Sequence, residues 1–184
     1  LRNVRIAGTN VILEGDINVS GNLTVPAGIL VDASSATVTV GGTFDHAGNW
    51  SGGIAMTNAG TTWLRSGSTT IAPAIWTVQG NFISAGTLNA TGSTLQFTGA
   101  ATQSFSSTTP LHTVSVNKSG GSLVLNSNLF INQTLNLDAG YITTGSVGFV
   151  QVNNSSPDAV TSLNGYVNGT LKRAMSSVTG EDFD

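Results

Sequence analysis

Nine acidic residues and two histidines are the side chains of this 184-residue chain that could carry out acid–base or metal chemistry. Enzymes that cleave polysaccharides do such work with clustered Asp and Glu, often beside Ca²⁺ and a basic residue. Here the acids are scattered, and Glu14-x-Asp16 is the one close pair in the regular part of the chain. The bases of that part, Arg65 and Lys118, have no acid nearby in sequence. The residues therefore predict a protein that is not an enzyme.

Metal binding is the second chemistry that these residues suggest. Asp45-His46 could supply two ligands, but the apolar spacing around them points Asp45 outward and His46 inward, and a lone inward His is most often simply hydrogen-bonded. Calcium takes about six to eight oxygen ligands, so the short acidic run near the C-terminal end is too small to bind it strongly. Its weak calcium candidates are Glu181, Asp182 and Asp184. No other cofactor is predicted, and the absence of Cys excludes thiolate metal sites.

Three tryptophans stand at equal spacings along the chain: Trp50, Trp63 and Trp76. An exposed indole can stack on a sugar ring, so these three are candidates for a carbohydrate-binding surface. The alternative is that they fill a wide interior or seal loops. Their segment, residues 48–76, is also where the pattern of the surrounding sequence is interrupted.

Apolar side chains recur at an interval of six residues, which we call the six-residue beat. This interval predicts which of the residues named above point inward and which point outward. Apolar residues at i and i+2 share one face of a short strand, and the three residues that follow give room for a turn. One row repeats at a step of six and a second row is offset by two: Val11, Ile17, Leu23 and Ile29, then Leu13, Val19, Val25 and Val31. A chain that repeats this unit coils into a solenoid with its apolar residues inside.

A longer motif, apolar-x₃-apolar followed by Gly, sets the length of the coil. Copies begin at Val19, Val40, Val78 and Ile131, which corresponds to a coil of about 18–21 residues. The sequence thus predicts an all-β parallel β-helix of roughly seven or eight coils, forming a rod on the order of 35–40 Å long. Large aliphatic residues in both inward slots favour the right-handed form.

The domain organisation follows from where the rhythm holds. We expect the β-solenoid to cover residues 1–155, with an irregular excursion near 48–76. The pattern fades at Asn153–Pro157, so residues 156–184 are expected to be a cap or the lead-in to a further domain. The chain starts with Leu1, which suggests a processed product or an excerpt whose ends pair with the rest of a longer chain.

The amino-acid composition limits the kinds of partner that the protein is expected to bind. Charged residues make up only 8% of the chain, and Thr, Ser, Asn and Gly replace them with 25, 21, 17 and 23 copies. Six basic residues and a net charge of −3 cannot form a phosphate-binding stripe, so nucleic acid is not an expected partner. No apolar run approaches the ~18 residues of a transmembrane segment.

Several phrases resemble the β-helical repeats of giant bacterial surface adhesins exported by the type IX secretion route. They are Gly21-Asn22-Leu23, Gly80-Asn81-Phe82, Asp138-Ala139-Gly140-Tyr141-Ile142 and the run 165–173, GYVNGTLKR. The resemblance implies a secreted protein at the cell surface with structural or adhesive work, whose partners are surface glycans, other cells or solid surfaces. It carries over no catalytic residue.

The function expected from the sequence is therefore that of a non-catalytic stalk or adhesive module of a large extracellular protein. The alternative is a β-helix that binds or cleaves polysaccharides through the Trp-containing segment. Ice binding is a minor alternative, because Thr37-x-Thr39 has the pattern of an ice-binding strand but does not recur at the six-residue step.

Overall fold

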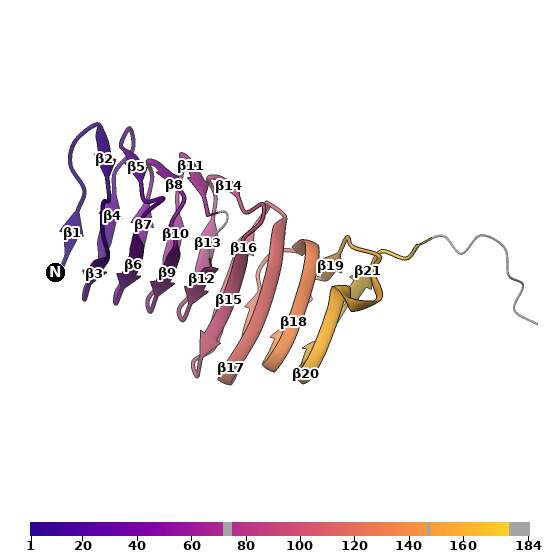
Figure 1. The fold of residues 1–184 in the computed structure, drawn as a ribbon. Helices are drawn as coiled ribbons and strands as arrows, with labels where there is room; N and C mark the ends of the chain where they lie inside the picture. Colours follow the sequence, from indigo (N-terminus) through magenta and orange to yellow (C-terminus); the bar gives the residue numbers. More distant parts are fainter. Residues whose placement is uncertain (72–74, 147, 177–184) are drawn as a thin grey trace, which may run out of the picture.

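The six-residue beat folds into short parallel strands that stack coil upon coil, as the computed structural model in Figure 1 shows. The structure describes residues 1–71, 75–146 and 148–176. It is an all-β solenoid of about eight turns, as the sequence predicts. In the described residues the one helical segment is a single 3₁₀ turn, η1 (Pro157–Ala159).

Two sides of the solenoid belong to one continuous sheet of 16 strands. The first face contains β3 (Ile17–Val19), β6 (Thr37–Val40), β9 (Ala55–Asn58), β12 (Ile75–Val78) and β15 (Thr94–Gly99). The second face contains β1 (Val4–Arg5), β4 (Leu23–Val25), β7 (Phe44–His46), β10 (Thr62–Leu64), β13 (Phe82–Ser84) and β16 (Gln103–Ser107). Three longer strands join the two faces: β17 (Leu111–Leu125), β18 (Leu129–Thr143) and β20 (Val160–Asn168).

The third face is a separate five-stranded sheet. It contains β2 (Asn10–Ile12), β5 (Leu30–Asp32), β8 (Asn49–Ser51), β11 (Ser68–Thr70) and β14 (Thr87–Asn89). At the C-terminal end the start of β18 pairs with β19 (Val150–Val152), which pairs with β21 (Leu171–Arg173). Every strand pair of the described residues is parallel, so each coil hydrogen-bonds to the coils next to it.

The core is the column of inward side chains inside these faces. The residues of the beat lie where the sequence places them, since Val19, Leu23, Val25 and Val31 are all buried. Paired strands put like residues above one another, as in Leu23 opposite Phe44. Because burial of apolar surface is the dominant favourable term in folding, this continuous column holds the coils together.

The segment 48–76 is a regular pair of coils in its described part and not the irregular excursion that the sequence suggested. Strands β8 to β12 pair in register with their neighbours on both sides. The rhythm was hidden because Asn58 and Thr62 occupy two slots that hold Val40 and Phe44 one coil earlier. Both are buried, and Asn58 Nδ2 donates a hydrogen bond of 2.9 Å to Thr62 Oγ1. The pair satisfies itself inside the core, as buried polar groups must.

The stack also continues past the expected boundary at residue 155. Strand β20 pairs with β18 and β21 pairs with β19, so the solenoid reaches Arg173. The pattern fades in the sequence because this coil is a long one, in which the chain travels from Leu135 to Val160 before the two residues pair. In one of the shorter coils it travels only from Thr37 to Ala55. The extra residues of the long coil include η1, which leads directly into β20 and whose Ala159 is buried.

Glycines make one corner narrow enough for coils to stack. A Cβ on Gly80 would collide with the carbonyl oxygen of Gly60, and one on Gly60 would collide with that of Gly42. Neither contact is with a movable side chain, so only glycine fits this column. The repeated Gly of these corners therefore reflects backbone packing between coils.

Candidate functional site

The acidic residues of the first coils point outward. Glu14 and Asp16 are exposed, and Asp16 Oδ1 accepts a hydrogen bond of 3.1 Å from the backbone N–H of Thr37 in the next coil. Asp32 Oδ1 accepts one from Ser34 N–H at 2.9 Å. These carboxylates cap turns. Among the described residues no three His, Asp or Glu side chains gather as a metal site would require.

The three tryptophans divide into two that are buried and one that is exposed. Trp50 and Trp76 are 2% and 1% exposed, and both pack edge-on against Phe44, with ring centroids 5.2 and 6.0 Å away. The Trp50 indole N–H donates to the carbonyl of Gly52 at 3.0 Å. Trp76 fills the interior, and Trp50 borders the hollow of the third face described below but is itself buried, so neither residue offers an exposed ring on which a ligand could stack. Trp63 is 37% exposed and is the one candidate of the three that faces solvent.

Trp63 belongs to a surface group that the sequence did not bring together. Arg65 forms a two-pronged ion pair with Asp45, with Nε–Oδ1 and Nη2–Oδ2 distances of 2.5 and 3.0 Å. The same guanidinium lies 3.7 Å from the centroid of the Trp63 ring. These three side chains line a hollow of about 390 Å³ on the outer side of the second face. The proximity of Asp45, Trp63 and Arg65 follows from the strand register between β7 and β10, because Asp45 pairs with Trp63 one coil away.

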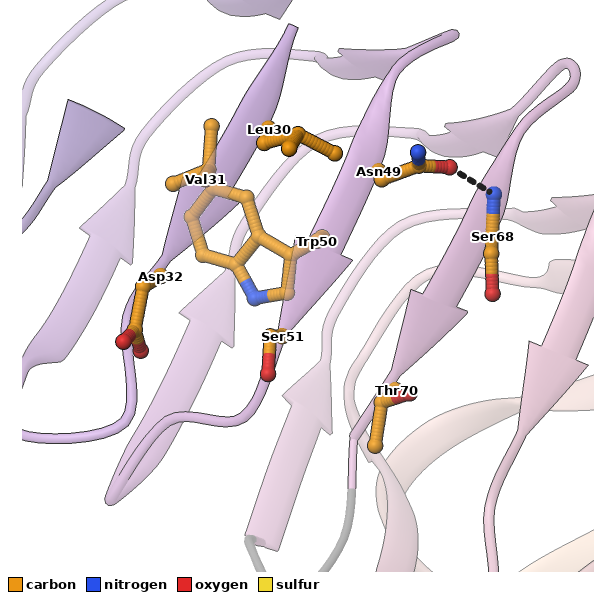
Figure 2. Close-up of a pocket in the computed structure, with 8 residues that line it drawn as sticks. All are labelled: Leu30, Val31, Asp32, Asn49, Trp50, Ser51, Ser68 and Thr70. Carbon is orange, nitrogen blue, oxygen red and sulfur yellow. Dashed lines mark hydrogen bonds between the residues drawn. The ribbon is translucent and has the colours of Figure 1, made fainter. Parts of the chain in front are cut away.

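A second hollow, of about 440 Å³, lies on the outer side of the third face (Figure 2). Its lining comes from β5, β8 and β11 and is mainly neutral, with Leu30, Asn49 and Ser68 among its residues. Asn49 Oδ1 accepts a hydrogen bond of 2.9 Å from Ser68 N–H, which ties adjacent coils together. Hydrogen bonds from the side chain and then the backbone of Ser34 lower the pKa of Asp32, the one ionisable residue of this lining. This hollow offers hydroxyl and amide groups but no acid–base pair.

Outward threonines line up on the first face. Thr39, Thr57 and Thr77 are paired residues of β6, β9 and β12 and form one row. The row beside it runs from Thr37 through Ala55 and Ile75. Of the Thr37-x-Thr39 pattern, the second threonine therefore recurs in each of the next two coils, and the first is replaced by Ala55 and Ile75. The pattern does not recur at the six-residue step.

His46 faces the core, as predicted, and is fully buried. Its Nδ1 lies 3.2 Å from Thr69 Oγ1, while its Nε2 has no hydrogen-bond partner in the described structure. Its ring stacks on Phe44 at 5.7 Å. Burial lowers the pKa of His46 from 6.5 to about 4, against a smaller opposing effect of Asp45. The side chain is therefore a neutral core residue at pH 7.

This burial predicts a loss of stability in acid. Between pH 6.5 and pH 4 the unfolded state binds a proton that folded His46 does not, so the free energy of unfolding falls as the pH is lowered through this window. The loss should reach roughly 3 kcal/mol below pH 4. Urea titrations at a series of pH values measure it.

The matched variant is His46→Leu, because Val25 and Leu64 occupy the paired positions in the neighbouring coils. The stability of this variant should depend less on pH in the same window. His112→Gln removes a partly exposed imidazole and should behave as the wild type. Equal acid sensitivity of wild type and His46→Leu would show that another group is responsible.

Lys118 is a buried cation on β17, and its ammonium group lies at the corner between β15 and β16. It is 2% exposed, and its Nζ donates to Gln103 Oε1 at 2.6 Å and to the carbonyls of Ala101 and Gly99 at 2.8 and 3.4 Å. Gln103 Nε2 in turn donates to the carbonyls of Val78 and Gly80. Burial lowers the pKa of Lys118. The network binds the corner carbonyls of adjacent coils, which is a structural task.

The weak calcium candidates Glu181, Asp182 and Asp184 lie outside the described residues. In the described ranges no helix is long and apolar enough to cross a bilayer. Comparison of the chain with protein-family models, with curated proteins and with solved structures finds no match.

Proposed function

We propose that this chain is a rigid, non-catalytic module of a larger extracellular bacterial surface protein and that it works as a stalk with an adhesive surface. The observation that carries the proposal is the continuous pairing of parallel strands along the described chain, from β1 to β21, which persists through the register shifts between β17 and β18. A rod built this way holds its two ends at a fixed separation, because each coil is fastened to its neighbours by backbone ladders and a shared core.

The outer surface supports the adhesive part of the proposal. It carries few charges and many hydroxyl and amide groups, arranged in rows by the register. Single contacts of this kind are weak, but many of them along one rod add up because the later contacts form at high effective concentration. Placement at the cell surface rests on the resemblance of the repeat phrases to exported adhesins.

Beads coated with the protein should resist detachment under flow on glass, cellulose or mucin-coated surfaces better than albumin-coated beads. Heat-unfolded protein on the same beads is the control, because it keeps the composition but loses the rows. Detachment at the albumin level on all three surfaces would contradict the adhesive role. Release of reducing sugar from polysaccharides would contradict the non-catalytic role, and inhibition of ice recrystallisation would favour the ice-binding alternative.

A further inference from the structure

The hollow around Trp63 crosses several coils of the second face. Thr24, Asp45, Trp63 and Ile83 are paired residues of β4, β7, β10 and β13, and all four line it. Four neighbouring strands span about 14 Å at the usual strand spacing. The hollow is therefore elongated along the solenoid axis and can accept a chain of several linked units.

Trp63 supplies a flat apolar surface in this hollow. Trp63 is 37% exposed even though the Arg65 guanidinium covers one face of its ring, whereas Trp50 and Trp76 in the same and the next coil are buried. Leaving part of a large apolar ring in water forgoes the stabilisation that its burial would give. Its negative π-face attracts the positive C–H edges of a ring laid against it, and a pyranose presents such C–H groups.

The polar groups beside the ring are held in fixed orientations. Asp45 and Arg65 lock each other through two hydrogen bonds, and each keeps further acceptor or donor positions in its plane. Asn22 Oδ1 accepts the backbone N–H of Thr43 at 2.9 Å, which orients the amide at the rim of the same hollow. Fixed planar donors and acceptors next to an aromatic ring are suited to the adjacent hydroxyls of a sugar. The charges of Asp45 and Arg65 cancel, which favours a neutral sugar over a uronic or sialic acid.

We propose that the hollow formed by Trp63, Asp45 and Arg65 binds neutral pyranose units of a glycan chain that lies along the solenoid axis. This inference rests on the proposed adhesive function and names its ligand class. The glycan C–H groups lie on the part of the Trp63 ring that the Arg65 guanidinium does not cover, and the glycan hydroxyls bond to the Asp45–Arg65 pair. No bond is made or broken.

The test is isothermal titration of the 184-residue chain with cello-, xylo-, manno- and chito-oligosaccharides, and with oligogalacturonate as the anionic comparison. At least one neutral oligosaccharide should bind. Trp63→Ala should weaken that binding about tenfold or more, and Trp63→Phe, which keeps a smaller ring, should fall between it and the wild type. Asp45→Asn, which loosens the hold on Arg65, should weaken binding several-fold.

Tyr166→Ala is the matched control, because Tyr166 is an exposed aromatic on a different outer row and is 55% exposed. It should bind as the wild type, and circular dichroism melting should show that all the variants are folded. The proposal is overturned by the failure of all the neutral oligosaccharides to bind, by equal binding to wild type and Trp63→Ala, or by preference for the anionic oligosaccharide. If coated beads still resist flow in any of these cases, the adhesive function stands and only the glycan site is wrong.

Discussion

Phe105→Ala should lower the free energy of unfolding by about 3–5 kcal/mol. Phe105 is fully buried and stacks on Phe82 with ring centroids 5.8 Å apart and planes 8° apart. Phe97 meets the same ring edge-on at 6.1 Å. Removal of the ring leaves a cavity between two backbone ladders that cannot collapse to fill it, because the strand spacing is fixed by hydrogen bonds. Guanidinium titration followed by circular dichroism measures the loss.

The control is Phe130→Ala. Phe130 also meets another ring edge-on, that of Phe149 at 5.6 Å, but it points outward from β18 and is only partly buried. Its loss should cost no more than about 1.5 kcal/mol. Similar losses in the two variants would mean that the interior column contributes no more than the surface pair, which would contradict the packing argument.

The second large effect is expected at Lys118. Lys118→Met keeps most of the aliphatic stem and removes the ammonium, so Gly99 O, Ala101 O and Gln103 Oε1 lose their donor. Gln103 cannot compensate, because its amide nitrogen already donates to two other carbonyls at 2.9 and 2.7 Å. Buried acceptors left without partners should lower the free energy of unfolding by about 3–5 kcal/mol. The same denaturant titration measures this.

Lys172→Met is the matched control, since Lys172 is exposed and its Nζ lies over the Phe149 ring at 3.7 Å. That change should cost less than about 1 kcal/mol. A double-mutant cycle with Gln103→Leu should show a coupling of at least about 0.5 kcal/mol between positions 103 and 118. Additive losses would mean that the two side chains act separately and that the network is not a unit.

The inward rows could be predicted from the sequence because strand periodicity alone assigns a side. Val19, Leu23 and Val25 are apolar at the positions that a two-residue period sends inward, and all three are buried. The same reasoning places Asp45 outside and His46 inside. Apolar spacing is sufficient wherever the inward residues are apolar.

The coil through Asn58 and Thr62 could not be recognised in this way. Two polar residues occupy inward slots and satisfy each other by a side-chain hydrogen bond across a turn. A pattern of apolar residues has no means of showing such a pair. The coil therefore looks like an interruption in the sequence, although its strands have full register with both neighbours.

The surface and corner groups were missed for another reason. Arg65 bonds to Asp45, which lies one coil earlier, and Lys118 bonds to Gln103, which lies 15 residues before it in the sequence. The two partners of each contact are therefore far apart in the sequence. The coils differ in length, as the pairing of Leu135 with Val160 and of Thr37 with Ala55 shows, and a uniform repeat cannot tell which residues will meet. These contacts become predictable only once the register of each coil is known.

The stacking of whole coils has a consequence for how such a chain can change over generations. A duplication or deletion of one coil's worth of codons leaves the flanking ladders able to pair again, because every interface joins the same kinds of parallel strands. Each such event would lengthen or shorten the rod by a step of about 4.8 Å. The distance between the two ends would therefore change in whole increments, while the outward side chains on each coil remain free to diverge.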